Sequence, residues 1–213
     1  MGEYDYDYEY KIVFLGGSGV GAKTSLISRL NNDYIENPCS TAGGSYTPIY
    51  IQVNLGIIKL LLWDTAGQER FWQLSRYFIK GSHCVILGYD ITNKRSFSDI
   101  QEFWYNHAKN IVSEKSLIYL VANKIDLIGK EEVSEKEAME YAKEKGIKYF
   151  RVSAKTGEGV NELLDDISYS LIIKFKNNIN KNDINLLRED EKKIKRIHRR
   201  NNIEIILNKY LNY

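Results

Sequence analysis

Residues 12–30 restrict the possible folds more than any other part of the chain. An apolar run, 12–15, leads into the glycine-rich residues 16–24 (GGSGVGAKT), and a helical pattern, 25–30, follows them. Glycine lets the backbone turn so that successive N–H groups point into one concavity, and the N-terminus of the next helix adds the positive end of its dipole. This order of strand, glycine-rich turn and helix predicts a site for phosphate groups.

The spacing within this predicted phosphate loop is irregular. The usual pattern is Gly, four residues, then Gly-Lys-Ser/Thr. Counted from Gly16, the second glycine is Gly21, and Ala22 is inserted before Lys23; counted from Gly17, the spacing fits but Ala22 replaces the glycine. Alanine tolerates a positive φ poorly. Both registers stay open, and so does a glycine-rich turn that holds no ligand.

Length and composition indicate one globular domain in a reducing compartment. The 213 residues are 43% hydrophobic and 27% charged, which is ordinary for a soluble protein with a buried core. Cys39 and Cys84 are expected to be free thiols. No apolar run approaches the roughly 20 residues that span a bilayer, and the acidic, tyrosine-rich N-terminus does not resemble a signal peptide. The sequence therefore predicts a cytoplasmic protein.

Charge is distributed unevenly along the chain. Residues 174–213 hold 11 Lys/Arg and 5 Asp/Glu, whereas the rest holds 19 and 23, for a net charge of +2. A basic tail on a slightly acidic body is typical of a solvated arm. It either contacts an anionic membrane surface peripherally or only aids solubility. No nucleic-acid partner is expected.

Apolar runs and helical patterns alternate along the chain. The predicted strands are 11–15, 49–55, 58–63, 85–89, 117–122 and 148–152, and the predicted helices are 24–31, 96–111, 134–145 and 160–175. Residues 33–47 are expected to form a long surface loop, and Pro48 places the next strand at an edge. Residues 4–10 either extend the first strand or are disordered. The alternation predicts an α/β fold with a doubly wound, mostly parallel sheet and one antiparallel edge strand.

Ligands of such sheets bind beyond the carboxyl ends of the strands, and three further motifs fall there. The first is 64–70 (DTAGQER). Asp64 can hold Mg²⁺, the Gly67 N–H can bond a terminal phosphate, and Gln68 can orient a water for in-line attack. The alternative is a polar loop after a strand.

The second motif, 123–126 (NKID), follows the strand 117–122. A carboxylate such as Asp126 can accept hydrogen bonds from the N1–H and the 2-amino group of guanine, and adenine offers no such pair. Lys124 is expected against the base and the loop, and Asn123 is expected to tie neighbouring loops together.

The third motif is Ser153-Ala154-Lys155, which follows the last strand. A backbone N–H in this segment can bond O6 of guanine, although a helix-capping turn would have the same residues. Each motif is common alone. Their occurrence in this order, each at a strand end, indicates a site for a guanine nucleotide.

With these motifs, residues 8–175 resemble the Ras superfamily of small GTPases and, within it, the Rab family. The resemblance rests on 59–63 (KLLLW), 63–71 (WDTAGQERF), Lys80-Gly81 and 89–92 (YDIT). It implies the small-GTPase fold of the P-loop NTPases, with a six-stranded sheet. The expected organisation is an acidic N-terminal extension (1–9), a GTPase domain (10–176) and a basic hypervariable tail (177–213).

The resemblance also implies an activity and its partners. A Rab-like protein binds GTP and GDP with Mg²⁺ and hydrolyses GTP slowly, as a monomeric molecular switch in vesicle traffic on endomembranes. Exchange factors, GTPase-activating proteins and effectors would bind its two switch segments. The implied catalytic residues are Gln68 and Lys23, and the implied metal ligands are Thr24, Thr41 and Asp64. The implied nucleotide-binding residues are Ser18, Gly19, Val20, Gly21, Ala22, Lys23, Thr24, Ser25, Tyr34, Thr41, Gly67, Asn123, Lys124, Asp126, Ser153, Ala154 and Lys155.

The sequence departs from the Rab pattern in places. Residues 42–46 read AGGSY where many Rabs have Ile-Gly-Val-Asp-Phe, and the printed sequence ends without a cysteine, so prenylation of this sequence is not expected. Because of Ala22, a nucleotide-binding switch or scaffold with little hydrolysis is an alternative. A phosphotransferase that uses ATP is a further alternative, against which Asp126 argues.

Overall fold

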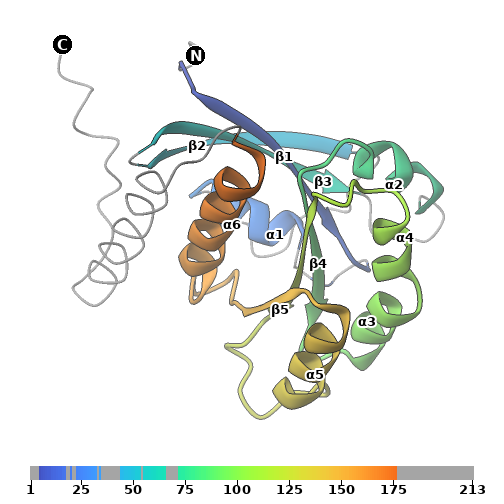
Figure 1. Ribbon diagram of the computed structural model, residues 1–213. Helices are drawn as coiled ribbons and strands as arrows, with labels where there is room; N and C mark the ends of the chain where they lie inside the picture. Colours follow the sequence, from blue (N-terminus) through green and yellow to red (C-terminus); the bar gives the residue numbers. More distant parts are fainter. Residues whose placement is uncertain are drawn as a thin grey trace.

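The computed structural model describes residues 5–17, 20, 23–32, 34, 44–53, 55–65 and 72–176, with 72–74 as backbone only. The strands of this part are β1 (Tyr8–Leu15), β2 (Gly44–Val53), β3 (Gly56–Thr65), β4 (Cys84–Asp90), β5 (Leu117–Asn123) and β6 (Lys148–Arg151). They form one sheet in the order β2-β3-β1-β4-β5-β6, in which β2 and β3 are antiparallel and the other pairs parallel (Figure 1). The predicted sheet is confirmed.

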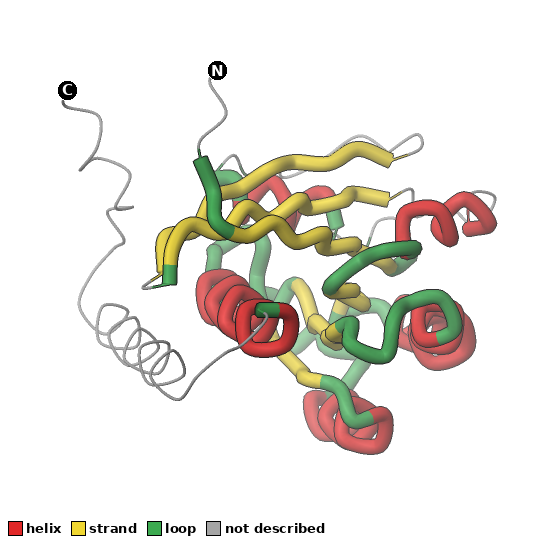
Figure 2. Tube along the Cα trace, turned by 45° about the horizontal axis from the view of Figure 1, so that its top comes forward, coloured by secondary structure: helices red, strands yellow, loops and turns green. Residues whose placement is uncertain are grey.

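Helices cover both faces of this sheet, whose strands form one layer in Figure 2. They are α1 (Thr24–Leu30), α2 (Trp72–Ile79), α3 (Lys94–Asp99), the π-helical turn η2 (Ile100–Trp104), α4 (Tyr105–Lys109), α5 (Glu135–Lys145) and α6 (Val160–Phe175). Successive side chains of a strand point to opposite faces. Phe14 therefore packs with α1 and α6, while Val13 packs with the helices of the other face.

Three elements differ from the sequence-based prediction. β2 begins at Gly44, inside the segment predicted as loop, because residues 44–47 pair with β3. The helix predicted over 96–111 is divided into α3, η2 and α4, and α2 was not predicted. Of the two alternatives for 4–10, Tyr8–Tyr10 extend β1. No helix of the described residues is long and apolar enough to cross a membrane.

Candidate functional site

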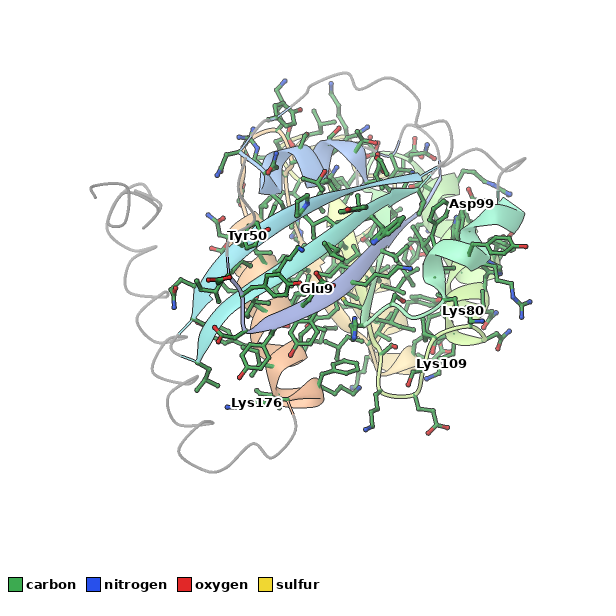
Figure 3. All side chains as sticks on the ribbon, turned by 90° about the horizontal axis from the view of Figure 1, so that it is seen from above. Glu9, Tyr50, Lys80, Asp99, Lys109 and Lys176 are labelled. Atoms are coloured by element: carbon green, nitrogen blue, oxygen red, sulfur yellow. The ribbon has the colours of Figure 1, made fainter. Side chains whose placement is uncertain are left out.

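The carboxyl ends of the parallel strands meet at one edge of the sheet. Gly16 follows β1, Asp64 lies near the end of β3, Asp90 ends β4, Asn123 ends β5, and Ser153 lies two residues after β6. In Figure 3, Glu9 marks the beginning of β1, and Asp99 lies near the opposite end, where its carboxylate is close to Gly17. The described parts of the four motifs therefore share one edge.

The turn after β1 requires glycine at its first position. Gly16 has a φ of 148°, and a Cβ there would lie 2.4 Å from the carbonyl oxygen of Gly88 on β4. The chain then enters α1 at Thr24, directly after Lys23. The predicted order of strand, turn and helix is confirmed. The register around Ala22 stays open, because 18, 19, 21 and 22 lie outside the described residues.

Lys23 lies inside this turn and is only 6% exposed. Its Nζ donates to the carbonyl oxygens of Gly16 at 2.9 Å and Gly17 at 2.5 Å. Burial lowers the pKa of Lys23 to about 8, and the carboxylate of Asp64 acts in the opposite direction. At pH 7 the ammonium is therefore mostly protonated. It supplies a positive charge where the sequence predicts phosphate groups.

Thr24 and Asp64 meet at the start of α1, as the predicted metal site requires. Oγ1 of Thr24 donates to Oδ2 of Asp64 at 2.7 Å, and Asp64 is 7% exposed. Hydroxyl and carboxylate oxygens suit Mg²⁺, which commonly combines one or two protein ligands with phosphate oxygens. Among the described residues, no group of three or more His, Cys, Asp or Glu side chains could hold a metal. The hydroxyl of Thr24 and the carboxylate of Asp64 supply the kind of oxygen ligands that suit a Mg²⁺ ion also bound by a phosphate.

The loops after β5 and β6 form one hydrogen-bonded cluster. Oδ1 of the buried Asn123 accepts from the N–H of Ala154 at 3.0 Å, so Asn123 joins the two loops as predicted. The hydroxyl of Ser153 donates to Oδ1 of Asp126 at 2.6 Å and accepts from the N–H of Thr156 at 3.0 Å. The carboxylate of Asp126 is therefore held in one orientation by the neighbouring loop.

Lys124 forms an ion pair with the buried Asp90, a contact that the sequence did not predict. Its Nζ lies 2.5 Å from Oδ2 of Asp90, and its own φ of 69° is unusual for a residue with a side chain. Oδ1 of Asp90 accepts from the N–H and the hydroxyl of Thr92, so both carboxylate oxygens are engaged. In this structure the ammonium that was expected to lie against the base is paired with the end of β4.

Arg29 on α1 contacts the loop after β6, and the sequence did not predict it as a site residue. Its Nε donates to the carbonyl oxygen of Ala154 at 2.6 Å, and its Nη2 donates to that of Lys155. Its guanidinium carbon lies 4.4 Å from the ring centroid of Tyr34. The sequence shows only that a basic residue lies on the helix after the phosphate loop. That pattern does not indicate which loop the side chain contacts.

The remaining predicted residues are placed in part. Val20 and Ser25 are buried, and the side chain of Lys155 is exposed. The other predicted site residues lie outside the described part of the chain, and these are Ser18, Gly19, Gly21, Ala22, Thr41, Gly67 and Gln68.

Comparisons with known proteins match most of the chain. The model of the Ras family matches residues 11–173. The chain is 34% identical over 185 residues to "Ras-related protein Rab-1" of Theileria annulata, covering 85% of this chain and 84% of that protein. It is 35% identical over 185 residues to human "Ras-related protein Rab-30", covering 86% and 90%, and 37% identical over 170 residues to "Ras-related protein Rab-13" of Canis lupus familiaris, covering 79% and 83%.

Proposed function

This chain belongs to the Rab family of the Ras-related small GTPases, and on that premise we propose that it binds GTP and GDP with Mg²⁺ and hydrolyses GTP slowly, as a switch in membrane traffic. The observation that carries the proposal is the cluster around Asp126. Ser153 orients the carboxylate, and Asn123 joins the two loops beside it. A carboxylate held in this way can pair with the N1–H and 2-amino group of guanine, and it would be left unpaired opposite adenine.

The other side of the site is suited to a triphosphate. Lys23 brings a positive charge to the turn after β1, and Thr24 and Asp64 offer oxygen ligands for Mg²⁺. When bound, Mg²⁺ would neutralise charge on the phosphate oxygens. We assign Gln68 the orientation of the attacking water and Thr41 a contact with the metal, both by family resemblance. The products are GDP and inorganic phosphate.

The regulators of the switch follow from family membership. We expect exchange factors, GTPase-activating proteins and effectors to bind the two switch segments of a monomer. Because the motifs offer no obvious arginine finger by sequence, we expect a partner to supply one, which in GTPases raises the rate by about 10³–10⁵. The basic tail is proposed to contact endomembranes peripherally.

A second candidate function is a guanine-nucleotide switch or scaffold with little hydrolysis. Ala22 favours it, because the family pattern places glycine where the backbone passes phosphate. Single-turnover hydrolysis of GTP by the full chain separates the two functions. The GTPase predicts a rate clearly above that of the Gln68→Leu variant. Equal rates in the two proteins, with tight GTP binding in both, would favour the scaffold.

A further inference from the structure

We propose that Asp90 is a positioning residue for recognition of the base, and that it acts through the backbone of Lys124 on the direction of Asp126. The inference rests on the proposed function, since it assumes that the carboxylate of Asp126 accepts from guanine. It gives a specificity role to β4, a strand that carries none of the predicted nucleotide-binding residues.

Lys124 has a backbone conformation that lysine adopts only when its surroundings impose it. Its φ of 69° lies in the left-handed region, where Cβ comes too close to the following carbonyl oxygen. Among the described residues, only Asn32 and Lys124 have a positive φ without being glycine. The short polar side chain of asparagine can bond locally in this region, and that of lysine cannot. Contacts outside the backbone of Lys124 must therefore hold it there.

Asp90 supplies such a contact through a buried ion pair. Its Oδ2 lies 2.5 Å from Nζ of Lys124, and Asp90 is 4% exposed. Its Oδ1 accepts from the N–H of Thr92 at 2.9 Å and from the hydroxyl of Thr92 at 2.8 Å, so the turn after β4 fixes the carboxylate. Removal of the ammonium would leave a buried charge without its counter-ion, which is costly, and the pair therefore resists separation.

The backbone on either side of this ion pair is also fixed. Asp90 lies opposite Asn123 where β4 and β5 pair, and the N–H of Ile91 donates to the carbonyl oxygen of Asn123 at 3.1 Å. The N–H of Asp90 donates to the hydroxyl of Ser96 at 3.0 Å. Because both partners of the ion pair start from this frame, the position of Asp90 decides where the side chain of Lys124 lies.

A short turn connects the conformation of Lys124 to Asp126. The carbonyl oxygen of Lys124 accepts from the N–H of Leu127 at 2.9 Å, which closes a turn over 124–127 with Asp126 as its third residue. The direction in which this turn leaves β5 depends on the φ of Lys124. A negative φ there would redirect the segment and move Asp126 relative to Ser153, whose hydroxyl donates to its carboxylate at 2.6 Å. Ser153 thus orients the side chain of Asp126, and Asp90 orients its backbone.

The test compares the affinities of the full chain for GDP and IDP with Mg²⁺ present. IDP lacks the 2-amino group from which Asp126 is proposed to accept. Both ligands carry the same ribose and diphosphate, so their affinity ratio cancels the effect of the changed charge at position 90 on the phosphates. We expect Asp90→Ala and Asp90→Asn to lower the preference for GDP over IDP by about fivefold, the effect of one weakened hydrogen bond. Asp90→Asn keeps an acceptor for Thr92 and removes only the ion pair.

A double-mutant cycle with Lys124→Gly tests whether Asp90 acts through Lys124. Glycine adopts a φ of 69° without strain. Lys124→Gly should therefore bind both nucleotides less tightly but keep its preference for GDP within about twofold of the wild type. In that background Asp90→Ala should change the preference by less than about twofold, because no side chain is left to hold.

Asp166→Asn is the matched control for the loss of an acid–lysine pair. Oδ2 of Asp166 on α6 lies 2.7 Å from Nζ of Lys148, which begins β6 at the strand end opposite the candidate site. This variant should lower the unfolding temperature without changing the preference for GDP over IDP. Thermal unfolding without nucleotide also verifies that each variant is folded.

The outcomes distinguish this inference from the proposed function. If the wild type does not bind guanine nucleotides, both are contradicted. If it binds them without preferring GDP over IDP, or if folded Asp90→Asn keeps the wild-type preference, only the role of Asp90 is contradicted. The same holds if Asp90→Ala lowers the preference as much in the Lys124→Gly background as in the wild type, because Asp90 would then act by another route.

Discussion

Single residues shape this edge of the sheet. Lys23 places a buried positive charge in the turn after β1, Asp126 has a carboxylate that accepts from Ser153, and Gly16 lets the chain pass β4. The sequence predicted the first two because their motifs encode local chemistry at strand ends. It did not predict that Asp90 pairs with Lys124, or that Arg29 reaches Ala154, because both contacts join segments far apart in the chain.

The buried ammonium of Lys23 predicts a pH dependence of binding. Its pKa in the free protein is about 8, and nearby phosphate oxygens would raise it, because they favour the charged form. Above pH 8, binding must then take up a proton, and GDP affinity should fall by up to about tenfold per pH unit. Below about pH 7 the lysine is protonated in both states, so its contribution to the affinity is constant there.

Titration calorimetry between about pH 6 and pH 9 measures this slope. Lys23→Arg is the control, because arginine stays charged throughout this range. Any pH dependence of its GDP affinity therefore comes from other groups, such as the guanine base. Equal slopes in the two proteins would contradict the role given to Lys23.

Gly16 predicts a large loss of stability on substitution. In Gly16→Ala the new methyl group would meet the carbonyl oxygen of Gly88 at 2.4 Å, at a φ that side chains avoid. We expect the free energy of unfolding to fall by about 2–4 kcal/mol. Gly81→Ala is matched, with a φ of 73° and no atom within 4 Å of the added group, and it should cost about 1 kcal/mol. Urea unfolding that gave equal losses would contradict the close approach of the strands.

At the scale of elements, local sequence signals predicted the position of α5 well. The start of β2, which depends on pairing with a distant strand, was not predicted. A helix was predicted over 134–145, and the structure has α5 there, with Ser134 as its N-cap and Gly146 as its C-cap. β2 begins five residues before the predicted strand because its polar first residues pair with β3. Pairing across a sheet depends on the partner strand, which composition along one segment does not reveal.

The cap of α5 provides a test at this scale. The hydroxyl of Ser134 accepts from the N–H of Glu137 at 3.2 Å. Ser134→Ala should lower the free energy of unfolding by about 1 kcal/mol, and Ser134→Asp, which can also cap, should lose less. Denaturant unfolding measures both. GDP affinity should not change, and a large change would show that α5 supports the site more directly than its cap implies.

At the scale of the whole molecule, the topology brings separate motifs together. Alternating strands and helices predicted a mostly parallel sheet, and such sheets gather their functional groups at one edge. The structure confirms this convergence for Lys23, Asp64, Asn123 and Ser153. The contacts of Lys124 with Asp90 and of Arg29 with Ala154 were not predictable, because they depend on how strands and helices far apart in the chain pack together.

Removal of Mg²⁺ tests whether the phosphate side works as a unit. If Thr24 and Asp64 hold the metal against GDP, a chelator should speed GDP release by about tenfold or more. This corresponds to a decrease of at least roughly 1.4 kcal/mol in the free-energy barrier to release. Stopped-flow release of a fluorescent GDP analogue measures this rate. Thr24→Ala should release GDP faster already and respond less to the chelator. If the chelator left the rate of GDP release from the wild type unchanged, the proposed role of Mg²⁺ would be contradicted.

The most direct test of the central claim is competition between GTP and ATP for the full chain in magnesium buffer. A carboxylate held by Ser153 should make the site select guanine, so unlabelled GTP should displace a fluorescent GDP analogue while ATP at about 100-fold excess should not. Asp126→Ala should narrow that difference. Equal displacement by GTP and ATP, or no binding of the GDP analogue at all, would contradict the assignment of this edge as a guanine-nucleotide site.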